Sequence, residues 1–161
     1  MGVRALRKKI LAPAPQSAVW RAWTTSAEAQ TFFAPRARID LRIGGRYEML
    51  FLPDNPAGQR GAEGVRILSF LPEEMLSFEW NAPPQFPEIR TQKSWVVVQL
   101  AAVTEEDTQV RLTHLGWGVR PVWEEVYAYF DRAWDIVLGR LQHRAAQGPL
   151  DWANPYRPPG T

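Results

Sequence analysis

The chain has 161 residues, of which 45% are hydrophobic and 22% are charged, and its formal net charge is +2. This balance fits one soluble domain large enough to bury a core, and no apolar run has the length of a membrane span or of a signal peptide. The absence of cysteine excludes disulfides, thiolate metal sites and cysteine nucleophiles, and it fits a reducing, cytoplasmic location.

The N-terminal part predicts one strand and two short helices. A first strand is expected over residues 3–11. Residues 17–23 carry apolar side chains at the spacing of one helical face, which predicts a first helix. Thr25 and Glu28 match a capping box, so a second helix should cover residues 26–32.

After Pro35 and up to Leu115 the hydrophobic period changes to two, which is typical of half-buried strands. Short turns between them favour antiparallel pairing. Gly44 and Gly45 are expected to supply the positive-φ pair of a tight hairpin. The predicted strands cover residues 39–43, 47–51, 64–71, 75–80, 93–102 and 108–115.

The longest predicted element is an amphipathic helix between Pro121 and Gly148. Apolar residues recur at steps of three and four from Trp123 to Leu141, and proline suits the first helical position. A glycine followed by proline ends the helix. Its N-terminal half is aromatic and its C-terminal half aliphatic, so one end can pack tightly while the other faces a void.

The chain is expected to form one domain over residues 1–148, followed by a proline-rich tail over residues 149–161. Disorder is the usual state of such an end. We hypothesise instead that Trp152 docks the tail onto the domain or onto a partner subunit.

Several motifs resemble a known family. The stretches VWRAWT (19–24), FFAPRARIDLRIGGRYE (32–48) and RLTHLGW (111–117), with an Ala-Trp pair at 133–134, look like homologues of the heat-shock-protein ATPase activator in the SRPBCC superfamily. The resemblance covers about residues 7–146. It implies an α+β helix-grip fold, shared by START-related domains and the birch-pollen allergen. In that fold a curved antiparallel sheet wraps around a long C-terminal helix, two short helices follow the first strand, and an apolar cavity lies between sheet and helix.

The resemblance leaves three functions open. The preferred one is binding of a small hydrophobic or aromatic molecule in the cavity. The second is an enzyme similar to polyketide cyclases or dehydratases, with His114 or a tyrosine as the proton donor. The third is a co-chaperone-like interaction module in the stress response. That role is disfavoured because the chain has no room for the N-terminal domain that makes the main chaperone contact in the activator.

Aromatic residues are the candidate cavity walls, because the chain has eight tryptophans and small-molecule pockets are mostly apolar. The same rings can also pack a core with their N–H groups satisfied locally. His114 faces the apolar side of its strand and can serve a ligand, or it can be a structural residue bonded to a backbone group or a tryptophan. The predicted ligand-binding residues are Trp23, Phe32, Tyr47, Phe51, Trp80, Trp95, His114, Trp117, Trp123, Tyr127, Phe130 and Trp134.

Other kinds of site find little support in the sequence. The two histidines lack metal-ligand spacing, and no nucleophile elbow surrounds a serine. Glu48 and Glu79 are expected in solvent, which argues against glycosidase-type chemistry. The arginines are scattered rather than clustered, unlike a nucleic-acid footprint. We therefore expect no metal, no cofactor and no nucleic-acid partner, while a homodimer is left open.

Overall fold

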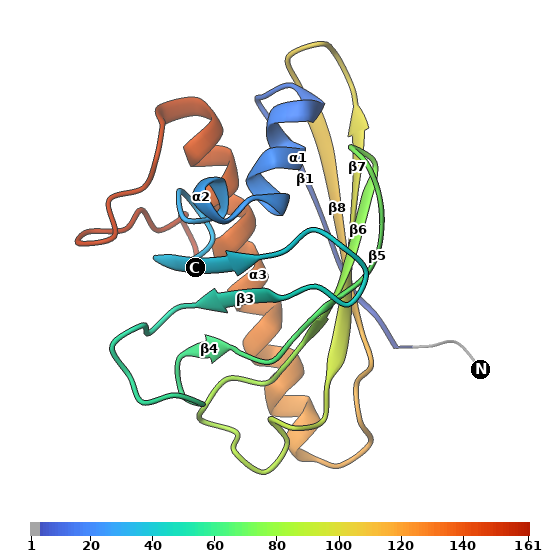
Figure 1. The fold of residues 1–161 in the computed structure, drawn as a ribbon, viewed down its shortest axis with the longest axis vertical. Coiled ribbons are helices and arrows are strands. Elements are labelled where there is room, and N and C mark those ends of the chain that lie inside the picture. Colours follow the sequence, from blue (N-terminus) through green and yellow to red (C-terminus); the bar gives the residue numbers. More distant parts are fainter. Residues whose placement is uncertain (1–3) are drawn as a thin grey trace.

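The long helix α3 is bounded by a five-stranded sheet on one side and a three-stranded sheet that crosses it (Figure 1). This computed structural model describes residues 4–161. The α+β helix-grip architecture expected from the sequence is confirmed. The elements are β1 (Leu6–Ala12), α1 (Gln16–Thr24), α2 (Ser26–Ala29), β2 (Arg36–Ile39), β3 (Tyr47–Leu50), β4 (Gly61–Ala62), β5 (Ile67–Leu71), β6 (Met75–Trp80), β7 (Ser94–Ala102), β8 (Thr108–Leu115) and α3 (Val122–Gln147).

The two sheets continue into one another. Their strand orders are β1-β8-β7-β6-β5 and β2-β3-β4, with antiparallel pairing throughout. An isolated bridge between Arg46 and Arg66 joins them, and the N–H of Tyr47 donates to the carbonyl of Val65 at 3.0 Å. The sheet therefore bends around α3 instead of remaining flat.

Two glutamates hold this junction, in contrast to the solvent position expected for them. The Glu48 carboxylate accepts the backbone N–H of Gly64 at 2.7 Å, and Glu79 accepts that of Arg66 at 3.0 Å. Their side chains are only 13% and 26% exposed. The expectation of solvated carboxylates was wrong because the sheet splits here and leaves N–H groups without strand partners.

Strand alternation places the core between the five-stranded sheet and α3. In β8 every second residue from Thr108 to His114 is buried, and in β7 the buried set runs from Ser94 to Leu100. The apolar stripe of α3 covers these strands, as its three- and four-residue spacing predicts. Trp134 lies in the middle of that stripe.

Some boundaries differ from the predictions. β2 ends at Ile39 instead of residue 43, and the hairpin is a longer loop in which only Gly44 has a positive φ, 76°. Gly45 is required for another reason, because a β-carbon there would overlap the carbonyl of Asp40. The second helix ends at Ala29 rather than near residue 32. The predicted first strand includes Val3, which lies outside the described residues, and the short β4 was not predicted.

The C-terminal tail packs back along α3 (Figure 1, red segment). Leu150 is buried, and the indole N–H of Trp152 donates to the carbonyl of Gln30 at 2.6 Å. The ring of Tyr156 stacks on His143 with centroids 3.9 Å apart. These contacts agree with the hypothesis that Trp152 docks the tail onto the domain.

Candidate ligand-binding site

A cavity of about 250 Å³ lies between α3, the three-stranded sheet and the loop that follows β6. It reaches the surface, where Tyr129 is 37% exposed. Most of its wall is apolar, no aspartate or glutamate lines it, and two arginines do. The lining residues are Phe33, Phe51, Leu52, Arg60, Gly61, Ala62, Trp80, Asn81, Pro83, Pro84, Gln85, Tyr129, Phe130, Ala133, Trp134, Ile136, Val137 and Arg140.

Three aromatic rings from separate parts of the fold form the inner wall. Phe33 follows α2, Trp80 ends β6, and Trp134 comes from the middle of α3. Their ring centroids are 5.8 Å apart for Phe33 and Trp80, 5.5 Å for Trp80 and Trp134, and 6.0 Å for Phe33 and Trp134. Such a group offers ring faces and edges to an aromatic ligand.

The polar groups of the cavity include two cations and a phenol. The Nε–H of Arg60 donates to the Asn55 carbonyl at 2.7 Å, and that of Arg140 donates to the Tyr156 carbonyl at 2.8 Å. Burial, with a smaller effect of a neighbouring arginine, lowers the pKa of Arg140, yet arginine stays charged in proteins. Burial raises the pKa of Tyr129, so its hydroxyl keeps its proton at neutral pH.

His114 lies next to this wall but does not line the cavity. The indole N–H of Trp134 donates to Nδ1 at 3.0 Å. The ring proton is therefore on Nε2, which lies 2.7 Å from the hydroxyl oxygen of Ser94. Burial lowers the pKa of His114 to about 3, so the ring is neutral near pH 7. Both nitrogens are thus engaged by the protein, and the histidine fixes the orientation of Trp134.

The structure brings four of the twelve predicted residues to the cavity: Phe51, Trp80, Phe130 and Trp134. Others fill the interior elsewhere. The Tyr47 hydroxyl donates to the Trp23 carbonyl at 2.7 Å, and burial raises its pKa well above its usual value. The predicted residues that do not line the cavity are Trp23, Phe32, Tyr47, Trp95, His114, Trp117, Trp123 and Tyr127.

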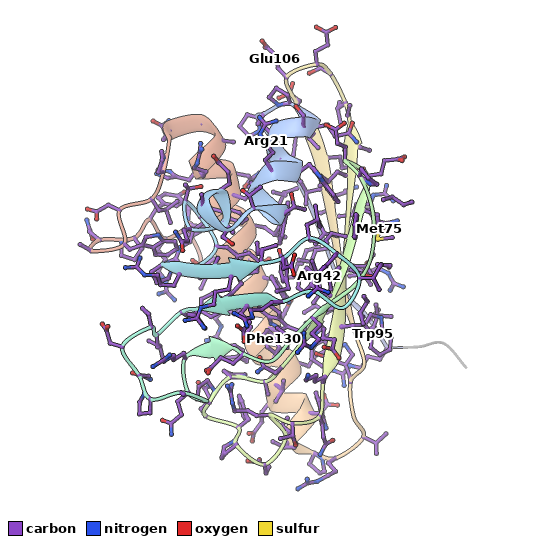
Figure 2. All side chains as sticks on the ribbon, in the orientation of Figure 1. Arg21, Arg42, Met75, Trp95, Glu106 and Phe130 are labelled. Carbon is purple, nitrogen blue, oxygen red and sulfur yellow. The ribbon has the colours of Figure 1, made fainter. Side chains whose placement is uncertain are left out.

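Three of these residues are not fully buried, namely Trp95, Trp117 and Tyr127. Trp95 is 39% exposed and points away from α3 on the outer face of the five-stranded sheet, whereas Phe130 lies on α3 (Figure 2). Strand parity could have placed Trp95 outside, since it alternates with the buried Val96 and Ser94. Tyr127 is half-buried, and the guanidinium of Arg4 lies 3.9 Å from its ring centroid.

Sequence reasoning missed several cavity residues. Phe33 directly follows the predicted site residue Phe32, just beyond the expected end of the second helix. Arg60 lies in a polar loop, where no periodic pattern indicates whether a side chain points inward or outward. Arg140 and Tyr129 were overlooked because helical periodicity assigns them to the exposed side of α3. Ala133 had a weak signal, as a small residue beside Trp134 on the long helix.

Residues 4–161 lack the features of two other kinds of site. This part of the chain contains no group of three or more histidine, cysteine, aspartate or glutamate side chains placed to hold a metal ion. None of its helices has both the length and the apolar composition needed to cross a bilayer.

Solved structures share the fold. Protein MLL2253 from Mesorhizobium loti is 20% identical, with a TM-score of 0.71 over 91% of this chain and 100% of that one. CalU16 from Micromonospora echinospora is 21% identical, with a TM-score of 0.66 over 92% and 78%. The Aha1 dimer from Colwellia psychrerythraea is 17% identical, with a TM-score of 0.67 over 90% and 98%.

The family of the chain is established by its amino-acid sequence. No curated protein matched it. Residues 13–146 match the family described as "Activator of Hsp90 ATPase homolog 1-like protein", in agreement with the resemblance seen in the sequence motifs. This match includes both short helices, every strand after β1 and nearly all of α3. The chain therefore belongs to the family of Activator of Hsp90 ATPase homolog 1-like proteins.

Proposed function

We propose that the protein binds a small hydrophobic or aromatic molecule in the 250 Å³ cavity. The observation that supports this proposal most directly is the unfilled space next to the aromatic rings of Phe33, Trp80 and Trp134. A hollow that reaches the surface and has apolar walls with a few polar groups has the usual composition of a small-molecule pocket.

The placement of the candidate proton donors favours binding over the enzymatic alternative. His114, Tyr47 and Tyr127 do not line the cavity, and both nitrogens of His114 already have partners. An enzyme using this cavity would depend on Tyr129, whose phenol lines it. The co-chaperone-like role, the homodimer and the cytoplasmic location stay predictions.

Calorimetric titration with naphthalene-2-carboxamide, a neutral bicyclic probe, tests the proposal. Ala133 lines the cavity on α3, so Ala133→Phe fills the space and should weaken probe binding at least tenfold. Ala128→Phe is the matched control, because Ala128 lies on the same helix, is exposed and does not line the cavity. Equal probe affinities in the two variants would contradict the proposal. Thermal unfolding of both variants checks that they fold.

A further inference from the structure

Five lysine and arginine side chains are half-buried within residues 4–161, and three of them have a carboxylate within 4.0 Å. Lys8 lies 2.6 Å from Asp131, Arg144 lies 3.2 Å from Glu28, and Arg90 lies 3.9 Å from Glu63. The remaining two are Arg60 and Arg140. Neither has a side-chain carboxylate within this distance in the described part of the chain, and both line the cavity.

This pattern is informative because withdrawing a cation from water is unfavourable unless an anion accompanies it. The protein supplies that anion for the three half-buried cations away from the cavity. At the cavity no aspartate or glutamate lines the wall, and Glu63 accepts the backbone N–H of Arg60 at 2.5 Å without forming an ion pair with its guanidinium. The two half-buried arginines that have no carboxylate partner are therefore the two that line the cavity.

The hydrogen bonds of the two arginines leave donors for such an anion. Arg60 and Arg140 each use Nε–H on a backbone carbonyl, that of Asn55 and that of Tyr156. Within residues 4–161 their terminal N–H groups make no hydrogen bond to the protein. A guanidinium whose terminal N–H groups are available suits a carboxylate, which accepts two such bonds in parallel.

The tail holds one of these cations in place. The carbonyl of Tyr156 fixes Arg140, whose guanidinium carbon also lies 5.6 Å from the ring centroid of Trp152. Burial lowers the pKa of Arg140, and the positive charge of nearby Arg157 adds a smaller effect in the same direction. Within residues 4–161 no side-chain carboxylate lies within 4.0 Å of the Arg140 guanidinium, whereas the Nε–H of Arg157 donates to the Thr161 oxygen at 3.2 Å.

We infer that the ligand is an aromatic carboxylate, with its ring system against Trp80 and Trp134 and its carboxylate facing Arg60 and Arg140. This inference rests on the proposed function and adds the charge of the ligand to it. The aromatic wall selects the ring system, and the two arginines select an anion over a neutral or cationic molecule of the same shape.

The test compares 2-naphthoate with naphthalene-2-carboxamide, which have the same ring system and nearly the same shape but differ in charge. Calorimetric titration of the wild type should give at least tenfold tighter binding of the carboxylate. In the double variant Arg60→Gln/Arg140→Gln, the ratio of the two affinities should fall to about one. Arg132→Gln is the matched control, because Arg132 is exposed on α3 and does not line the cavity, so it should keep the wild-type ratio.

The outcomes separate this inference from the proposed function. Equal affinities of the two probes for the wild type would overturn the carboxylate inference, while amide binding that is lost in Ala133→Phe would still support the cavity. A carboxylate preference that survives in the double arginine variant would also overturn it. If neither probe binds, the proposed function fails, and the inference fails with it. Added NaCl gives a further readout, since it should weaken only carboxylate binding.

Discussion

Two aromatic regions meet at Trp134, and they differ in how completely they are filled. On one side is the His114 cluster, in which the imidazole centroid lies 4.3 Å from Trp117 and 4.9 Å from Phe130. The indole N–H groups of Trp117 and Trp134 both have acceptors there. On the other side is the cavity, where similar rings face open space and two guanidinium groups lack a carboxylate.

The difference shows that residue type alone does not separate a packed aromatic core from a binding wall. Both regions use tryptophan and phenylalanine, and Phe130 and Trp134 belong to both. The distinguishing property is whether the space and the hydrogen-bonding groups are filled by the protein itself. Substitutions in the His114 cluster should therefore change stability, whereas substitutions at the cavity should change binding.

The largest expected effect is that of His114→Leu on stability. This change leaves the Trp134 N–H and the Ser94 hydroxyl buried without a partner, which should lower the free energy of unfolding by about 3 kcal/mol. Urea denaturation at pH 7 measures it. Ser94→Ala removes one partner only and should cost about half as much, with probe affinity unchanged because Ser94 does not line the cavity. A loss below about 0.5 kcal/mol in His114→Leu would show that the cluster adds little.

The second largest expected effect is the loss of stability at low pH that follows from the buried, neutral His114. The pKa of His114 is about 3 in the folded protein and 6.5 as its reference value. Between these values the unfolded chain binds more protons, so the free energy of unfolding falls as pH falls. From pH 6.5 to pH 5 the loss attributed to His114 is about 1.6 kcal/mol. Denaturation of the wild type and of His114→Leu at both pH values isolates this contribution. An identical pH dependence in the two proteins would contradict the assignment.

A smaller effect is expected from the tail. Deleting residues 150–161 removes the buried Leu150, the Trp152 hydrogen bond and the Tyr156 carbonyl that holds Arg140. A loss of about 1–2 kcal/mol should lower Tm by roughly 3–6 °C. Differential scanning calorimetry and light scattering measure Tm and oligomeric state. No change in either quantity would end the docking hypothesis.

The substitution Gly139→Ala tests the same contact with the full chain present. A β-carbon at Gly139 would overlap Pro158, so the tail must move away from α3. Alanine otherwise favours a helix over glycine by about 1 kcal/mol. A Tm below that of the wild type therefore indicates that the lost tail contact outweighs the gain in helix propensity.

Much of the fold could be predicted because its signals are local. The bounds of β6 and β8 agree with the prediction, and α3 begins and ends where proline and glycine indicated. The two-residue β4 was missed because it has no room for an alternating pattern. The turn at Gly44 and Gly45 was predicted with the wrong geometry. The sequence shows that glycine is needed there, but it does not show that Gly44 is needed for a positive φ and Gly45 for a close approach of the Asp40 carbonyl.

The candidate site was predictable only in part. Alternation tells whether a side chain points inward, so Trp80 and His114 were both assigned to the interior correctly. It cannot tell which inward-facing rings meet other side chains and which border a void, because that depends on how distant segments pack. The cavity arginines were missed because arginine is expected on the polar, exposed side of the fold. The sequence pattern does not distinguish a half-buried arginine from an exposed one.

The most direct measurement of the central claim is the native mass of the freshly purified protein, followed by denaturation and analysis of the released material. The account predicts a stoichiometric small aromatic molecule on the wild type and on Ala128→Phe, and none on Ala133→Phe. Wild-type protein at its bare chain mass, or the same bound molecule on Ala133→Phe, would contradict the claim that this cavity is a ligand-binding site.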